Sequence, residues 1–196
     1  LEHRIALVLT AAIPTLAWLD PSQLALFLSL AFLVVATVKL FRPVPIDKAN
    51  EDLGRLALGL LYGGLIYTFP LLLARDHRPW LLVLAAAVWA GDTGAYFAGR
   101  LLGRNKLYPL VSPKKTIEGS IGGVLASAGG AWIALWLLSL VHAPWPTAWA
   151  VIPVTTAVGF GAVVGVVEQV GDLVESLIKR SAGIKDSGSI LPGHGG

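Results

Sequence analysis

Six apolar segments, each of about the length needed to cross a lipid bilayer, follow one another along this chain. They lie at residues 4–19, 23–41, 54–73, 79–101, 117–141 and 148–178. A helix needs about 20 apolar residues to cross the hydrocarbon core of a membrane. The pattern therefore predicts an all-α fold, a polytopic integral membrane helix bundle with about six transmembrane helices.

The composition supports a membrane protein rather than a soluble one. Hydrophobic residues make up 55% of the chain and charged residues only 14%, whereas soluble domains carry about 25% charged residues. The formal net charge of +3 is modest and gives no reason to expect a nucleic-acid partner. The chain has no cysteine, which excludes disulfides and thiolate chemistry.

The lysines and arginines are distributed very unevenly between the two sets of loops. If the N-terminus lies inside, 13 of them fall on the inner side and only Arg75 and Arg78 on the outer side. Cytoplasmic loops of membrane proteins carry such an excess of positive charge. We therefore expect both termini in the cytoplasm, with the basic loop 100–116 and the polar tail 179–196 on the same face.

An acidic residue, Asp92, lies well inside the fourth apolar segment, in the stretch WAGDTGAYFAGR. A charged carboxylate at such a depth costs about 2.5–3.5 kcal/mol on insertion scales. A cation, a metal ion or a water-filled cavity could compensate for it, and Gly91 and Gly94 would allow a ligand to come close. The alternative is a local helix distortion in which Asp92 accepts hydrogen bonds from backbone amides.

The sixth segment carries a stripe of charged residues in the stretch GVVEQVGDLVESLIKR. Glu168, Asp172, Glu175 and Lys179 are spaced four, three and four residues apart, which puts them on one helical face, and Ser176 borders it. Carboxylates near a polar opening are suitable ligands for Mg²⁺, which takes one or two of them together with substrate phosphates. Ion pairs within the helix end, such as Glu175 with Lys179, would explain the same pattern.

The loop 100–116 contains five cations and ends in the stretch SPKKTIEG. Ser112 and Thr116 flank the lysines, Ser112-Pro113 is a plausible helix or turn entry, and Glu118 stands at the start of the next helix. Lysine ammonium groups and hydroxyls are the donors that phosphate oxygens require. Simple anchoring at the cytoplasmic surface would account for the lysines but not for the residues around them.

The tail repeats this chemistry. Lys179, Arg180 and Lys185 could neutralise phosphate, and PGHGG places His194 within a glycine-rich turn. A histidine among glycines can be a turn residue as well as a functional one. With Lys115, these cations are expected to line one phosphate-binding cleft, because two basic segments on the same face attract a polyanion.

The motifs at 91–196 resemble those of phosphatidate cytidylyltransferases, also called CDP-diacylglycerol synthases. The similarity rests on GDTGAY at 91–96, SPKKTIEG at 112–119, GDLVES at 171–176 and SLIKRSAGIKDSGSILPGHGG at 176–196. The last of these matches the family signature over some twenty positions with fixed spacing. The helices before residue 79 resemble the family only in general character.

The resemblance implies a reaction in which phosphatidate and CTP give CDP-diacylglycerol and pyrophosphate, with Mg²⁺ as the cofactor. It implies catalytic roles for Asp172, Lys179, Arg180, Lys185 and Asp186. It implies substrate contacts from Asp92, Ser112, Lys115, Thr116, Glu118, Ser176 and His194. Asp172 and Glu175 are the expected metal ligands. The partners would be CTP, phosphatidate and membrane lipid, and a homodimer is a candidate assembly.

The resemblance also divides the chain. Residues 1–78 would be N-terminal membrane helices and residues 79–196 the catalytic membrane region of an enzyme of the bacterial inner membrane, with its active site facing the cytoplasm. The family signature continues past Gly196 to an Asp-Arg pair. We therefore expect that the chain is truncated inside the signature and that this polypeptide alone is not fully active.

Two other function classes are compatible with these residues. A cation transporter could use Asp92 and the acidic stripe as an ion path, although the two halves of the chain show no inverted repeat. A CTP-dependent polyprenol or lipid kinase would share the same substrate chemistry. Release of pyrophosphate, of CDP, or of neither distinguishes the three.

Overall fold

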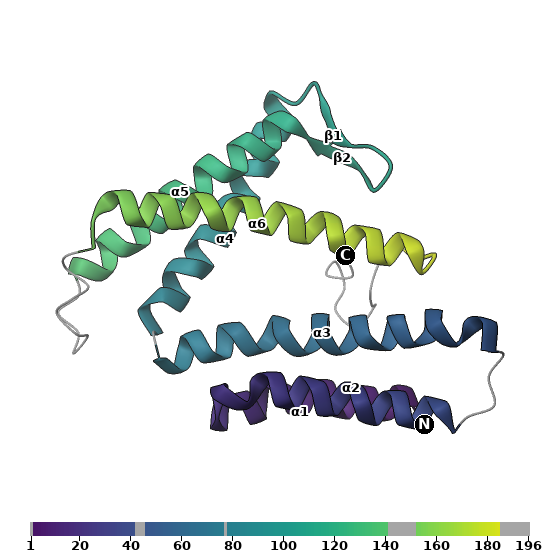
Figure 1. Ribbon diagram of the computed structural model, residues 1–196. Coiled ribbons are helices and arrows are strands. Elements are labelled where there is room, and N and C mark those ends of the chain that lie inside the picture. The colour runs from purple at the N-terminus through teal and green to yellow at the C-terminus, as the bar shows by residue number, and fades with distance from the viewer. Residues whose placement is uncertain (1, 42–45, 77, 141–151, 185–196) are drawn as a thin grey trace. The chain divides into compact units, whose positions relative to one another are not determined.

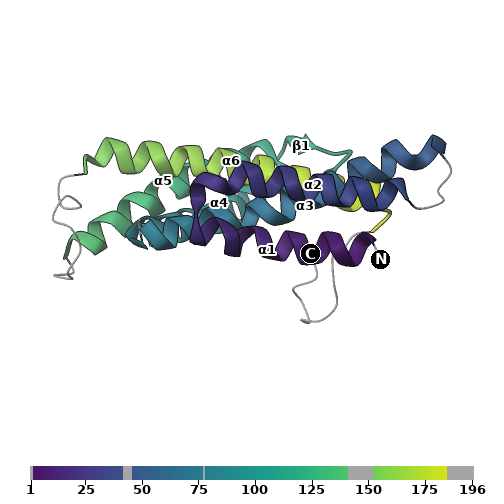
Figure 2. The ribbon, with the colours of Figure 1, turned by 60° about the horizontal axis from the view of Figure 1, so that its bottom comes forward.

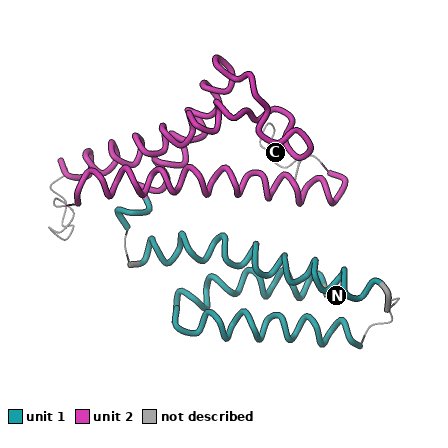
Figure 3. The backbone as a smooth tube through the Cα atoms, turned by 45° about the horizontal axis from the view of Figure 1, so that its top comes forward, with its two compact units in different colours: residues 1–81 teal, residues 82–196 magenta. Residues whose placement is uncertain are grey.

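In a computed structural model, the chain forms two compact units, Leu1–Leu81 and Leu82–Gly196 (Figure 3). The structure describes residues 2–41, 46–76, 78–140 and 152–184. Each unit is built from long helices, and each is described by itself below.

The first unit contains three long helices. They are α1 (Glu2–Leu19), α2 (Leu24–Leu40) and α3 (Ile46–Asp76), with a short 3₁₀ turn η1 (Pro21–Gln23) between the first two. The turn forms because the Asp20 side chain accepts hydrogen bonds from the Ser22 backbone amide and hydroxyl. This reverses the chain and lays α1 and α2 side by side, as Figure 2 shows.

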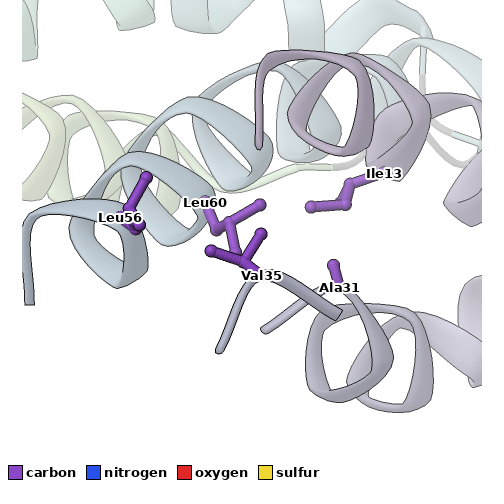
Figure 4. Close-up of a cluster of buried hydrophobic side chains, with 5 residues drawn as sticks. All are labelled: Ile13, Ala31, Val35, Leu56 and Leu60. Atoms are coloured by element: carbon purple, nitrogen blue, oxygen red, sulfur yellow. The ribbon is translucent and has the colours of Figure 1, made fainter. Parts of the chain in front are cut away.

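The core of this unit lies where its three helices meet. It consists of small and branched apolar side chains, drawn in Figure 4: Ile13, Ala31, Val35, Leu56 and Leu60. The one charged side chain among the buried residues of α2, Lys39, has its ammonium 2.6 Å from an Asp52 carboxylate oxygen on α3. Burial of a charge is tolerated when it is paired in this way.

The second unit contains the remaining helices and a small hairpin (Figure 1). These elements are α4 (Arg78–Leu101), whose first turn belongs to the first unit, β1 (Lys106–Tyr108), β2 (Ser112–Thr116), α5 (Ile117–Leu140) and α6 (Val154–Ser181). The two strands pair antiparallel, with Lys106 opposite Thr116 and Tyr108 opposite Ser112. Helices α5 and α6 run side by side.

Glycines let the helices of the second unit come very close together. A Cβ atom placed on Gly161 of α6 would lie 2.5 Å from the Ser127 carbonyl oxygen of α5. On the other side of α5, a Cβ on Gly94 of α4 would lie 2.8 Å from the Gly122 carbonyl oxygen. Small residues at helix contacts are typical of membrane bundles, where close packing takes the place of the hydrophobic effect.

The predicted fold class is confirmed. Six α-helices occupy the described parts of the chain, and five of the spans there are long and apolar enough to cross a membrane, while the helix His3–Leu19 is shorter. Two boundaries differ from the expected ones by more than three residues, since α3 already begins at Ile46 and α6 begins only at Val154.

The hairpin is the main departure from the sequence-based expectation. Ser112-Pro113 opens a strand rather than a helix or a turn. In a two-stranded sheet, half of the backbone N–H and C=O groups of each strand point away from the partner strand and make no hydrogen bond within the sheet. A proline, which has no N–H, can therefore be tolerated in such a strand.

Candidate functional site

A cavity of about 380 Å³ lies between α4, the end of the hairpin, α5 and α6. Its lining combines small residues with charged ones. The lining residues are Gly91, Asp92, Ala95, Tyr96, Gly99, Arg100, Lys114, Lys115, Thr116, Gly119, Ser120, Glu168, Gln169 and Asp172. All of them belong to the second unit, so this unit alone forms the cavity.

An ion pair joins the hairpin to α6 at the cavity. The Lys115 ammonium lies 2.7 Å from a carboxylate oxygen of Asp172, 57 residues further along the chain. The two residues were expected to face one cleft, and the structure brings them into direct contact. Asp172 is half exposed and Lys115 about a quarter exposed, so both remain accessible to a ligand in the cavity.

Two further cations line the same cavity. Arg100, in the last turn of α4, donates to the Tyr96 hydroxyl at 2.8 Å, which fixes the position of the guanidinium. Lys114 lies next to Lys115 on β2. With Lys115 these groups form a cationic rim of the kind that binds phosphate oxygens.

Acidic side chains line the same cavity. They are Asp92 of α4 and Glu168 and Asp172 of α6. One Glu168 carboxylate oxygen and the hydroxyl oxygen of Ser127 are buried without a hydrogen-bond partner within the described residues. A cavity lined by both acids and cations can hold a phosphate together with a cation.

The start of α5 is held in place by two predicted site residues. The Thr116 hydroxyl accepts a hydrogen bond from the Gly119 amide at 3.1 Å, which is an N-cap. Glu118 accepts hydrogen bonds from the backbone amides of Arg104 and Asn105 and from the Asn105 side chain, at 2.8 to 3.2 Å. Glu118 therefore braces the chain that leads into the hairpin, while Thr116 both caps α5 and lines the cavity.

Other predicted site residues lie away from the cavity or outside the described residues. Ser112, Ser176, Lys179 and Arg180 are described but do not line the cavity. The Lys179 ammonium lies 2.8 Å from Glu175, so the predicted metal ligand Glu175 already has an ionic partner. Lys185, Asp186 and His194 lie outside the described residues.

Several lining residues were not among the predicted site residues. Arg100 and Tyr96 follow Asp92 at intervals of four residues, a spacing that puts all three on one face of α4 and could have pointed to them. Glu168, four residues before Asp172, already belongs to the charged stripe that the sequence places on one face of this helix, although the family resemblance gave it no role. Gln169 gave no such signal. Its side chain is positioned by a hydrogen bond to the backbone carbonyl oxygen of Ser120, at 2.8 Å, and a backbone partner leaves no pattern in the sequence.

The carboxylates of the cavity fit an Mg²⁺ ion that shares its coordination with phosphate. Asp92, Glu168 and Asp172 all line the cavity, and their carboxylate oxygens are the ligand type that Mg²⁺ prefers. Among the described residues, no three histidine, cysteine, aspartate or glutamate side chains form a complete metal cage. One or two carboxylates together with substrate phosphates and water are the usual ligands of Mg²⁺.

The fold and the cavity define an integral membrane protein with a polar, cation-rimmed site between its helices. The sequence profile of the Cytidylyltransferase family matches residues 3–196, and the chain belongs to this family.

Curated relatives agree with this assignment. A phosphatidate cytidylyltransferase of Staphylococcus haemolyticus (strain JCSC1435) is 34% identical over 179 residues, which cover 91% of this chain and 64% of the relative. A phosphatidate cytidylyltransferase of Brucella suis biovar 1 (strain 1330) is 39% identical over 190 residues, which cover 92% of this chain and 64% of the relative. A phosphatidate cytidylyltransferase of Synechocystis sp. (strain ATCC 27184 / PCC 6803 / Kazusa) is 47% identical over 111 residues, which cover 57% of this chain and 34% of the relative. The chain thus spans slightly less than two thirds of the length of the first two relatives.

Proposed function

We propose that the protein transfers a cytidylyl group from CTP to phosphatidate. A phosphate oxygen of the lipid attacks the α-phosphorus of CTP, the bond between the α-phosphorus and the bridging oxygen breaks, and pyrophosphate leaves with that oxygen. The products are CDP-diacylglycerol and pyrophosphate. The observation that carries this proposal is the Lys115–Asp172 pair at the cationic rim of the cavity, in a chain of the Cytidylyltransferase family.

The cavity residues supply what this reaction needs. Phosphoryl-type transfer depends mainly on positioning and on neutralising charge. Lys115, Arg100 and Lys114 would bind the phosphates of CTP, because their cationic groups line one cavity. Lys179 and Arg180, further along α6, would meet the lipid phosphate. Asp172 holds Lys115 in place before the substrate binds.

Mg²⁺ is the proposed cofactor. Asp172 would hold it, together with the carboxylate of Asp92 or Glu168, which line the same cavity. When bound, the ion would neutralise triphosphate charge and polarise the phosphorus that is attacked. Asp172 and Glu175 each pair with a lysine, but of the two only Asp172 lines the cavity, so Asp172 is the proposed ligand.

The proposed location is the bacterial inner membrane, with the cavity open to the cytoplasm. The uneven distribution of lysine and arginine supports this orientation, because 13 of these residues then lie inside. CTP is a soluble cytoplasmic anion and phosphatidate a membrane lipid. A site that opens at the cytoplasmic ends of membrane helices would receive both.

The decisive experiment follows the fate of CTP in proteoliposomes that contain phosphatidate. We expect release of pyrophosphate only when both substrates are present, and Asp172→Asn should lower turnover at least about a hundredfold, because several kcal/mol of charge stabilisation are lost. Glu51→Gln is the matched control, since Glu51 pairs with Arg55 on the exposed surface of the first unit.

The products separate the proposed function from its alternatives. A CTP-dependent kinase would release CDP, and a cation transporter would leave CTP intact. If the turnover of Asp172→Asn stays within about threefold of that of the unchanged protein, Asp172 does not act in the site. Loss of a charge contact in the site should cost more than about 1.4 kcal/mol, which corresponds to a tenfold loss of turnover.

A further inference from the structure

A second hollow adjoins the polar cavity on the side of α5 and α6. It is a groove of about 370 Å³ with an almost wholly apolar lining. Its apolar walls are Leu107 of β1, Ile121, Val124 and Leu125 of α5, and Val166, Val170 and Leu173 of α6. The volume lies within the range of small-molecule sites, about 300–1,000 Å³.

Within the described residues of the second unit, the side chains along the groove are exposed rather than packed against another helix. Leu125 is 68% exposed and Val170 55% exposed. Both lie on helices long and apolar enough to cross a membrane, so the groove would face hydrocarbon. Lipid tails are as apolar as these side chains. A flexible hydrocarbon chain is therefore the natural occupant of a space of this size.

The groove and the polar cavity share one wall. Ser120 and Gln169 line both hollows, and the Gln169 side chain donates to the Ser120 carbonyl oxygen at 2.8 Å. On one side of this hydrogen bond lie the cations that would bind phosphate, and on the other lies hydrocarbon-like surface. An amphiphile with a phosphate headgroup could occupy both hollows at once.

The two hollows lie beside each other along α6, and the groove continues further along α5. On α5 the cavity ends at Ser120, whereas the groove continues to Leu125, more than one turn further from the hairpin. On α6 the groove runs from Val166 to Leu173 and thus passes the cavity residues Glu168 and Asp172 on both sides. Along α6 the groove covers about 10 Å. A molecule with its phosphate at the cavity could thus lay its hydrocarbon tail in the groove beside it.

We propose that this groove binds an acyl chain of the phospholipid substrate while the phosphate of that lipid lies at the edge of the adjoining cavity, toward Arg180, where it can reach the α-phosphorus of CTP bound in the cavity. This inference rests on the proposed function and adds a subsite for the hydrocarbon part of phosphatidate. The groove selects lipids with chains long enough to fill it, and Gln169 separates the chain from the charged groups.

The first test fills the groove with a larger side chain. Val170→Trp and Leu125→Trp in proteoliposomes should raise the KM for dioleoyl phosphatidate about tenfold, because about two buried methylene groups, each worth about 0.8 kcal/mol, are displaced. The KM for CTP and turnover of water-soluble dibutyryl phosphatidate should stay unchanged. Val163→Trp is the matched control, since Val163 is 63% exposed on the same helix but outside the groove.

A second test does not depend on turnover. Phosphatidate with a photoreactive diazirine on one acyl chain should label the α6 peptide, and Val170→Trp should lower this labelling strongly, whereas Val163→Trp should not. Phosphatidylcholine with the same diazirine should label it several times less. A protein that is labelled in this way but releases no pyrophosphate would refute the proposed reaction and leave the groove assignment intact.

Three outcomes would overturn the inference. Equal labelling by phosphatidylcholine would mean that the groove holds bulk lipid. An equal loss of activity with dioleoyl and dibutyryl phosphatidate would mean that the tryptophans disturb the cavity itself. Efficient cross-linking of two Leu125→Cys chains, with unchanged KM in the tryptophan variants, would mean that a second copy covers the groove.

Discussion

Substitutions of Lys115 and of Arg180 should each weaken the binding of a different substrate, CTP for Lys115 and phosphatidate for Arg180. Lys115 lines the cavity beside Asp172, whereas Arg180 lies in the last turn of α6. Lys115→Ala should raise the KM for CTP about ten- to a hundredfold, because a hydrogen bond to a charged group contributes about 1.5–3 kcal/mol. Arg180→Ala should instead raise the KM for phosphatidate. Steady-state kinetics with each substrate varied in turn measures both.

Lys106→Ala provides the control for these variants. Lys106 is an exposed lysine of β1 that does not line the cavity. It should change neither KM by more than about twofold, since surface substitutions usually stay within about 0.5 kcal/mol. A similar effect of all three substitutions on both substrates would argue against separate phosphate sites.

Glu118 should act mainly through the backbone that it holds. Its carboxylate accepts hydrogen bonds from the Arg104 and Asn105 amides. Glu118→Ala should therefore accelerate hydrogen exchange at these two amides, because they lose their acceptor, and should lower activity by displacing the hairpin with Lys115. Glu118→Gln, which keeps an acceptor oxygen, should retain more of both. If exchange is unchanged while the KM for CTP rises, Glu118 instead contacts the substrate, as the family resemblance implies.

At the scale of helices, the contact between α5 and α6 depends on glycine. A methyl group on Gly161 would approach the Ser127 carbonyl oxygen to 2.5 Å, whereas a Cβ on Gly159 would have nothing within 4 Å. Gly161→Ala should destabilise the protein by about 1–3 kcal/mol through overpacking. Gly159→Ala should be neutral or stabilising by up to about 1 kcal/mol. Thermal unfolding in detergent micelles compares the two, and an equal Tm for both variants would contradict the packing described here.

The elements could be predicted from sequence to different degrees. Apolar runs of membrane length determine the helices almost alone, which is why the class of fold was predictable. The strands of the hairpin were not predicted, because SPKKT carries no alternation of apolar and polar residues. What stabilises the hairpin is not local: Ile117 donates to the Asn105 carbonyl oxygen at 2.9 Å, and Glu118 binds the amides across the loop.

The same distinction applies to the site. Helical spacing places Glu168 and Asp172 on one face, and the sequence was enough to show this. Spacing does not reveal which face of α4 meets which face of α6. The sequence led us to expect Lys115 and a metal ion on Asp172 at the same substrate, but the direct ion pair between the two residues required the structure.

For the molecule as a whole, the orientation in the membrane can be tested directly, because the chain contains no cysteine. Leu110 lies in the hairpin turn and Leu140 at the other end of α5, and both are exposed. In intact cells a membrane-impermeant thiol reagent that crosses only the outer membrane should label Leu140→Cys and not Leu110→Cys. Disruption of the inner membrane should expose Leu110→Cys as well. Labelling of both positions in intact cells would rule out the proposed orientation.

The glycines and alanines of the cavity wall also affect the entropy of ligand binding. Gly91, Ala95, Gly99 and Gly119 have no rotamers, so this wall loses no side-chain freedom when a ligand enters. Lys115 is already restrained by Asp172. Arg100 is likewise held by the Tyr96 hydroxyl, so the ordering cost falls chiefly on Lys114, at about 0.5–1.5 kcal/mol. A wall with more long, flexible side chains would add further costs of this kind, even if those side chains never touched the nucleotide.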